Sequence, residues 1–492
     1  MASISSPMLV THGLVRWSPS SHCIAAANGN SLIIRDARSL QIVQRYSAVG
    51  EVQALAWSAD SHLVLTASFK HAVVQLWSVQ DSSWTRKISE GVAGLVYTRW
   101  TPDARHIVTV SDFQLHATVW SLESPTAHCS IHNPKLAADG LSFTNNGTFL
   151  AVVERHGGKD FIGIYSCESW ELTVHFVIDS YDCVEVVWSP DGAYVTDTCN
   201  FLNMQPATRR SIAVRDTHLE FRVLLYSPDG TQLARYQAYE NALGLKSMMW
   251  SASGQFLALG SYDEHLRVLS HVTLKPIADF DHEQIATSRL HTSHLAIDFE
   301  ERYADVDVMD RPRGRRVAVS QRSSSLLSNS LQAASAAAQA AGEKKQCDIC
   351  FVKREPPFSV RTITCDPLLE NQKIGISRIV WSADSAFLAS KSDQMPYNVW
   401  IWRADTQMLH SVVSLLECVR NMRWDPVSSR LAITSGNGRV YFWANETVSW
   451  VDITIDSFQA LGIQWAPSGD ALVAVGRQQC CRISLPSVRN DI

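Results

Sequence analysis

The stretch EVQALAWSADSHLVLTAS (51–68) joins an alternating apolar segment ending in Trp57, a turn of Ser, Ala and Asp, and a second apolar segment. Variants of this unit recur along the 492-residue chain. Eight tryptophans open such units: Trp17, Trp57, Trp100, Trp188, Trp250, Trp381, Trp424 and Trp465. Phe143 opens a ninth, and the units from Trp17 to Trp188 follow one another every 40–45 residues. This is the period of a four-stranded propeller blade.

The composition of each unit agrees with short β-strands. Apolar and polar residues alternate before the tryptophan, as in a strand with one buried face. Asp, Ser, Pro and Gly in the following turn favour tight backbone conformations. A later strand ends on a second tryptophan in four units: Trp77, Trp120, Trp402 and Trp443. These two positions hold twelve of the 16 tryptophans, so we expect the rings to pack between blades rather than bind a ligand.

We therefore predict an all-β fold, a WD-repeat β-propeller whose nine units form a single closed ring of seven to nine blades. The last unit has only three apolar segments, whereas an extra apolar segment precedes Trp17. Pairing these chain ends would remove two open sheet edges. The expected organisation is a first propeller part at 1–284, an insertion at 285–360, and a remainder at 361–492 that closes on the N-terminal strand.

The insertion is predicted because 131 residues separate Trp250 from Trp381 without another tryptophan motif. Residues 311–361 are basic, rich in Ser and Ala, and lack strand periodicity. We interpret 285–360 as low-complexity and mostly disordered, with missing blades as the alternative. The interval after Trp188 is also longer than one repeat, and we expect a smaller insertion near residues 200–218.

Charge is unevenly distributed around a net value of −5. Residues 298–310 hold six acids and one arginine, whereas residues 311–361 hold ten Lys or Arg and three acids. The basic stretch is either a solvated linker or an arm for an acidic partner. Its densest part, offered as a partner-binding candidate, is Arg311, Arg313, Arg315 and Arg316.

Motifs for catalysis or for a cofactor are not found in this sequence. Phosphate-loop, nucleophile-elbow and zinc-protease patterns do not occur. The only Cys-x-x-Cys, Cys347 to Cys350, lacks the second pair that a structural zinc site requires. We predict a non-enzymatic protein with no catalytic, cofactor or metal residues, and keep a propeller enzyme as an alternative. Eleven irregularly spaced cysteines and no apolar run of about 20 residues indicate a cytoplasmic protein without a membrane span.

Longer stretches resemble one family in detail. They are EGVAGLVYTRWTPDARH (90–106), LEFRVLLYSPDGTQLARYQAYENALGLKSMMW and its continuation (219–275), NQKIGISRIVWSADSAFLASKSDQMPYNVWIW (371–402) and WDPVSSRLAITSGNGRVYFW (424–443). On these residues the chain resembles the WD-repeat protein eight family, the centrosomal and spindle-pole WD-repeat proteins. Tyr239 and Glu240 lie in AYENALGLKS, which propeller packing does not require, and are further partner-binding candidates.

The resemblance implies a scaffold at the centrosome, spindle pole or basal body. Its implied partners are a coiled-coil anchoring protein, a minus-end-directed kinesin and other components of the microtubule-organising centre. The implied role is to tether microtubule minus ends and to support spindle and cilium assembly. The alternative is an RNA- or ribosome-associated propeller, although the negative net charge argues against nucleic acid.

Overall fold

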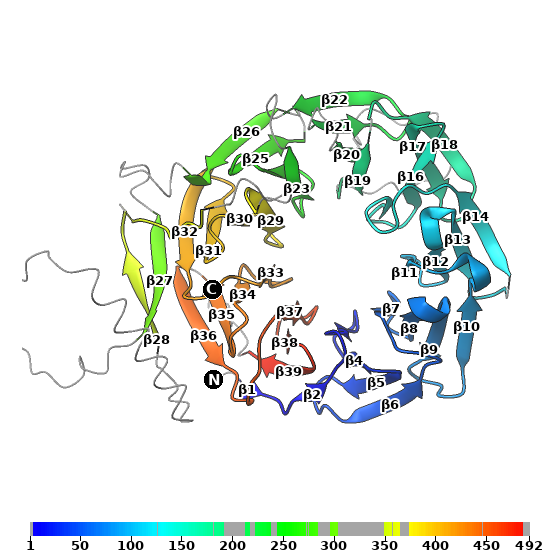
Figure 1. The fold of residues 1–492 in the computed structure, drawn as a ribbon, viewed down its shortest axis with the longest axis horizontal. Coiled ribbons are helices and arrows are strands. Elements are labelled where there is room, and N and C mark those ends of the chain that lie inside the picture. The colour runs from blue at the N-terminus through cyan, green and yellow to red at the C-terminus, as the bar shows by residue number, and fades with distance from the viewer. Residues whose placement is uncertain are drawn as a thin grey trace, which may run out of the picture.

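The computed structural model describes residues 3–190 except 125 and 181, 212–216, 222–237, 244–283 except 272 and 274, 296–303, 349–364 except 357, and 373–485 except 445. Nine β-sheets, eight of them antiparallel and one mixed, follow one another around a ring (Figure 1), which confirms the predicted single closed propeller and sets its blade number at nine. In each blade the first strand is innermost and the last is outermost. Besides strands, the described residues include three 3-10 turns, η1 (Phe69–His71), η2 (Gly91–Ala93) and η3 (Asp112–Gln114), and His282 and Glu283 have α-helical conformation.

The strands of the first five blades follow in chain order. Blade 1 holds β3 (Val15–Trp17), β4 (Cys23–Asn28), β5 (Ser31–Asp36) and β6 (Ile42–Ser47). Blade 2 holds β7 (Ala54–Trp57), β8 (Leu63–Ser68), β9 (Val73–Ser78) and β10 (Thr85–Ser89). Blade 3 holds β11 (Tyr97–Trp100), β12 (His106–Val110), β13 (His116–Ser121) and β14 (Ala127–His132). Blade 4 holds β15 (Leu141–Phe143), β16 (Phe149–His156), β17 (Lys159–Ser166) and β18 (Leu172–Val177). Blade 5 holds β19 (Cys183–Trp188), β20 (Ile212–Asp216), β21 (Arg222–Tyr226) and β22 (Gln232–Gln237).

The last four blades include two departures from the four-stranded plan. Blade 6 holds β23 (Leu245–Trp250), β24 (Phe256–Ser261), β25 (His265–Ser270) and β26 (Pro276–Asp281). Blade 7 holds β29 (Ile376–Trp381), β30 (Phe387–Ser392), β31 (Asn398–Arg403), β32 (Met408–Ser414), β27 (Ile297–Tyr303) and β28 (Ile349–Arg354). Blade 8 holds β33 (Asn421–Trp424), β34 (Leu431–Thr434), β35 (Arg439–Ala444) and β36 (Thr447–Asp452). Blade 9 holds β37 (Gly462–Trp465), β38 (Ala471–Val475), β39 (Gln479–Ser484), β1 (Ser3–Ile4) and β2 (Met8–Leu9).

The N-terminal strands complete the last blade. Ser3 pairs with Ser484 and Met8 pairs with Cys480, so β1 and β2 cover the outer edge of β39. Met8 and Val10 are buried in one apolar cluster with Trp17, at the junction of blades 9 and 1. The ring is therefore closed by strands from both ends of the described chain.

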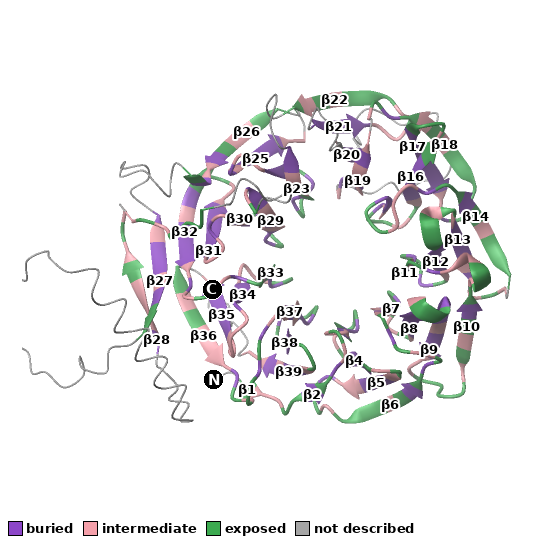
Figure 2. Ribbon diagram, in the orientation of Figure 1, coloured by how far each residue is buried: buried purple, intermediate pink, exposed green. Residues whose placement is uncertain are grey.

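The tryptophans that open the units lie between blades. All eight are 5–9% exposed, because the middle of each blade is apolar on both faces (Figure 2). The Trp57 indole Nε1 donates a hydrogen bond to the carbonyl of Arg16, the residue before Trp17 in the preceding blade, at 3.0 Å. The same bond to the residue before the preceding blade's tryptophan is made by Trp17, Trp100, Trp381, Trp424 and Trp465. This position of the repeat thus joins neighbouring blades by apolar packing, and in these six units by a hydrogen bond as well, whereas the buried indoles of Trp188 and Trp250 have no partner among the described residues.

The second tryptophan position is bonded within its blade. The Trp77 indole donates to the Thr66 hydroxyl at 2.8 Å, and Trp402 donates to the Ser390 hydroxyl at 2.9 Å. In blade 7 the buried imidazole of His282 extends this pair, with its Nε2 2.8 Å from the Ser390 oxygen. His282 follows Asp281 in the sequence and was not among the residues singled out there.

The tryptophans that the repeat leaves unexplained have separate positions. Trp400 is fully buried in β31, beside Trp402. Trp170 is buried in the turn between β17 and β18, and its ring centroid lies 5.4 Å from that of His106. Trp84 and Trp450 are partly buried against the apolar clusters of their blades. These four residues therefore add to the core without occupying a fixed position of the repeat.

The predicted insertion at 285–360 contributes two strands. β27 pairs in parallel with β32, and β28 pairs antiparallel with β27, so blade 7 has six strands. Phe299 and Ile349 are buried beneath this addition, and Asp298 accepts a hydrogen bond from Ser414 at 2.7 Å. These two strands are ordered parts of a segment that the sequence predicted to be mostly disordered, and their apolar alternation is short beside the Ser- and Ala-rich stretch. Residues 304–348 lie outside the described part.

The smaller insertion, predicted at 200–218, is also corrected. Ile212–Asp216 is β20, the second strand of blade 5, and it pairs with both β19 and β21. The repeat is therefore intact from residue 212 onward. The extra residues instead fall between Trp188 and Ile212, where 191–211 lie outside the described part.

Candidate partner-binding surface in the central channel

The first strand of each blade faces the axis of the ring, and its exposed positions follow from the alternation of side chains. In β3 and β33 the residue before the tryptophan is exposed between two buried neighbours. These strands are the innermost of their blades and border the central channel (Figure 1), and the side chains at this position are accessible to solvent. The residues at this position are therefore available to a partner.

Arginines occupy several of these channel positions. Arg16, Arg99 and Arg423 each come directly before the tryptophan, and Arg378 lies three residues before Trp381. Burial lowers the pKa of Arg16 and of Arg378, and the charge of Arg423 lowers both further. Within the described residues, the guanidinium groups of Arg16, Arg378 and Arg423 have no carboxylate at ion-pair distance. In the described part of the chain, the positive charge of these three residues is therefore not paired with a carboxylate.

A cavity of about 730 Å³ opens beside Arg423, where blades 8, 9 and 1 meet. Its polar lining includes Arg423, Arg477, Asn421, Gln464 and Gln478. No lining residue is a carboxylate, a cysteine, a Phe, a Tyr or a Trp. The cavity thus offers amide and guanidinium donors, together with the hydroxyl of Thr11 and the imidazole of His12.

A second hollow of about 400 Å³ continues this surface and shares Leu461 and Arg477 with the first. It adds Arg420 and the carboxyl of Glu417, whose pKa is raised by burial and by the charge of Glu301. We name the two hollows together the basic mouth. Guanidinium groups bind carboxylates and phosphates through paired, charge-assisted hydrogen bonds, so the basic mouth suits an acidic ligand.

The partner-binding residues predicted from the sequence stay predictions. Arg311, Arg313, Arg315, Arg316, Tyr239 and Glu240 all lie outside the described residues. The basic mouth was not found from sequence, although three units carry Arg before their tryptophan. The three arginines could have been noticed in the sequence. Their meaning depends on knowing that the residue before the tryptophan is exposed beside the central channel.

Among the residues that the structure describes, no helix has the length and apolar character needed to cross a membrane. The insertion thus contributes no such helix within its described strands.

Comparison with known proteins gives one extensive match. No family model matches the sequence. The chain is 35% identical over 473 residues to the mouse WD repeat-containing protein WRAP73, covering 95% of this chain and 92% of that protein. It is 20% identical over 386 residues to an uncharacterized WD repeat-containing protein of Schizosaccharomyces pombe, covering 74% of this chain and 65% of that protein. Among solved structures, the C-terminal WD40 domain of Sif2 aligns over 99% of both chains with 11% identity and a TM-score of 0.48.

Proposed function

The chain belongs to the WRAP73 family of WD-repeat proteins, and on this premise we propose that it is a non-enzymatic scaffold at the centrosome or spindle pole. In this proposal it binds a coiled-coil anchoring protein and tethers microtubule minus ends, together with a minus-end-directed kinesin. The same complex at the basal body would support cilium assembly. A rigid ring is suited to this work because it holds binding surfaces in fixed positions without conformational cost.

The observation that carries the proposal is the basic mouth. Arg420, Arg423 and Arg477 line its two hollows, and Glu417 is the single carboxylate residue among the lining residues. Coiled coils carry rows of charged residues flanking their apolar seam, so an acidic stretch of such a helix would match this surface. We infer that the anchoring protein presents Asp or Glu side chains to the mouth.

RNA is less well matched to the same surface. Recognition of single-stranded RNA relies on aromatic side chains that stack on the bases, and the cavity lining contains no Phe, Tyr or Trp. We therefore treat RNA binding as an outcome of the experiment below rather than as a second proposal.

Charge reversal at Arg423 and Arg477 is expected to weaken partner binding by about tenfold or more, since two favourable contacts become repulsive. The test is to express tagged Arg423→Glu/Arg477→Glu protein, follow its position through cell division, and measure recovery of the anchoring protein. Both side chains are exposed, so we expect the melting temperature to change little.

Arg45→Glu is the matched control, because Arg45 is an exposed arginine on the outer strand β6. The Arg45→Glu protein should still concentrate at the spindle poles. A double variant that still concentrates at the poles with normal partner recovery would refute a role for the mouth. Diffuse wild-type protein throughout division would refute the scaffold itself, and binding of RNA lost in the double variant would favour the alternative.

A further inference from the structure

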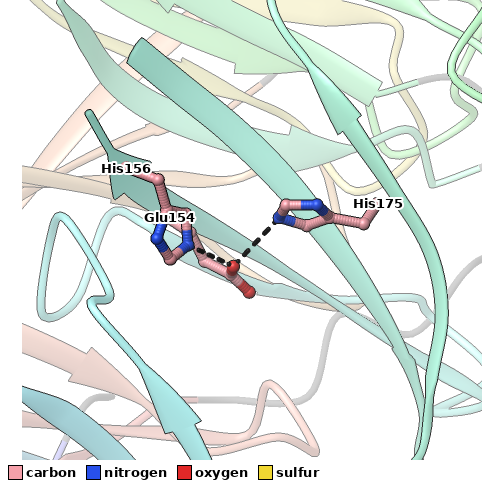
Figure 3. Close-up of side chains that lie close together, drawn as sticks. All are labelled: Glu154, His156 and His175. Atoms are coloured by element: carbon pink, nitrogen blue, oxygen red, sulfur yellow. Dashed lines mark hydrogen bonds and ion pairs between the residues drawn. The ribbon is translucent and has the colours of Figure 1, made fainter. Parts of the chain in front are cut away.

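Two histidines and a glutamate converge in blade 4. Glu154 and His156 lie two residues apart on β16, and His175 lies on β18, two strands away (Figure 3). One ligand atom from each residue falls within 4.8 Å of the others. We propose that Glu154, His156 and His175 bind a divalent transition-metal ion, with Zn²⁺ as the best match to this donor set.

The distances suit a tetrahedral ion. Nε2 of His156 and Nε2 of His175 each lie 3.1 Å from the same oxygen, Oε2 of Glu154. Zinc bonds of about 2.0–2.1 Å place tetrahedral ligand atoms roughly 3.3 Å apart. A small outward shift of the two half-exposed rings therefore brings all three atoms to coordination distance, and leaves the fourth position open toward solvent.

The carboxylate is unusual for its place in the repeat. In blade 2 the residue bonded to the third-strand aromatic is Thr66, eleven positions before Trp77. Glu154 stands eleven positions before Tyr165 and accepts its hydroxyl at 2.7 Å, so a buried acid replaces a neutral hydroxyl. No described lysine or arginine lies within ion-pair distance of Glu154. A buried carboxylate needs compensating charge, which a bound cation supplies.

The sheet leaves room for this carboxylate. Gly163, in the central strand β17, pairs with Val152 of β16 and with His175 of β18. A Cβ added at Gly163 would lie 2.4 Å from Oε1 of Glu154. Glycine weakens a strand and often marks a place where another group approaches closely. The side chain of Glu154 therefore crosses the empty position of Gly163 to reach His175.

Neighbouring groups orient the three proposed ligands. The Tyr165 hydroxyl fixes Oε1 of Glu154, and the ring of Phe161 stacks on His175 with centroids 5.0 Å apart. The side-chain amide nitrogen of Asn133 lies 3.4 Å from Nδ1 of His156, and with the amide turned its oxygen accepts a hydrogen bond from an Nδ1–H there. Glu154 and His156 thus have polar outer partners of the kind that positions metal ligands, and His175 is held by ring stacking.

The experiment uses the purified full chain, stripped of metal and titrated with Co²⁺ and then Zn²⁺. We expect one equivalent of Co²⁺ to give the visible absorption of a tetrahedral nitrogen–oxygen site, and Zn²⁺ to displace it. Saturating Zn²⁺ should raise the melting temperature by about 3 °C. His175→Ala should weaken binding about 100-fold or more, and Tyr165→Phe, which only removes the outer contact, about tenfold.

Two variants keep the result interpretable. His265→Ala is the matched control, because His265 is similarly exposed and lies 2.7 Å from Asp279 without a second histidine; it should leave the Co²⁺ spectrum unchanged. His156→Asn removes a half-exposed ligand and serves if His175→Ala fails to fold. Absent Co²⁺ absorption, binding that persists in both ligand variants, or a thiolate charge-transfer band indicating the cysteines would each overturn the proposal.

Discussion

Deleting residues 1–10 is expected to lower the free energy of unfolding of the entire ring by about 5 kcal/mol or more. The deletion removes β1 and β2, exposes the edge of β39, and takes Met8 and Val10 out of the apolar cluster at the junction of blades 9 and 1. It also removes the hydrogen bond from the Val10 amide to the Gln478 carbonyl, at 2.9 Å. Burial of two such side chains contributes about 2–3 kcal/mol each, and an open edge adds to the loss.

Urea denaturation and calorimetry of the truncated chain measure this effect. Met8→Ala and Leu9→Ala form a matched pair within β2, because Met8 is 5% exposed and Leu9 is 62% exposed. The first should cost about 2–3 kcal/mol and the second almost nothing. A truncated protein with unchanged thermal unfolding would show that closure by the N-terminal strands does not stabilise the ring.

Acidification from pH 7 to pH 4.5 is expected to cost about 2 kcal/mol of stability through His282 alone. Burial lowers the pKa of this imidazole to about 4, from an ordinary value of about 6.5. Its Nδ1 lies 3.0 Å from the Glu264 carbonyl, so Nε2 accepts the Ser390 hydroxyl and has no place for a second proton. Below pH 6.5 the unfolded chain takes up a proton that the folded chain refuses. Stability is therefore lost as the pH falls toward 4.

The measurement compares urea stability at the two pH values in wild type and in His282→Gln. The variant will be less stable at pH 7, but its loss on acidification should be about 2 kcal/mol smaller. Burial raises the pKa of Glu264 and of Asp298, and such groups favour the folded state at low pH, so only the difference between proteins isolates His282. The exposed His132→Gln is the control. An equal acid loss in His282→Gln and wild type would contradict the assignment.

The repeat could be predicted from the sequence because its tryptophans mark a periodic contact. Trp57 and Trp424 make the same contact at two different junctions between blades, so a period in sequence corresponds to a period in space. Strands β27 and β28 could not be predicted in this way. The pairing of β27 with β32, and of β28 with β27, has no counterpart in the other blades. Their apolar alternation was present but short, beside a long stretch of biased composition.

The candidate sites were harder to predict because they depend on strand register. His175 reaches Glu154 only because both strands flank Gly163, and nothing in a spacing of 21 residues indicates this contact. Likewise, Arg378 and Arg423 become neighbours only when blades 7 and 8 are placed side by side. Sequence periodicity therefore specified the ring, whereas the grouping of polar side chains required its three-dimensional register.

The pairing of Ser3 with Ser484 also has a consequence in time. The ribosome adds about 5–20 residues per second, so roughly half a minute to a minute and a half separates the synthesis of these two partners. During that interval β1 and β2 have no strand to pair with, and the face of blade 1 that packs against blade 9 remains exposed. Contacts so distant along the chain form slowly and leave strand edges open to association. Newly made protein is therefore most vulnerable to aggregation just before its last strand appears.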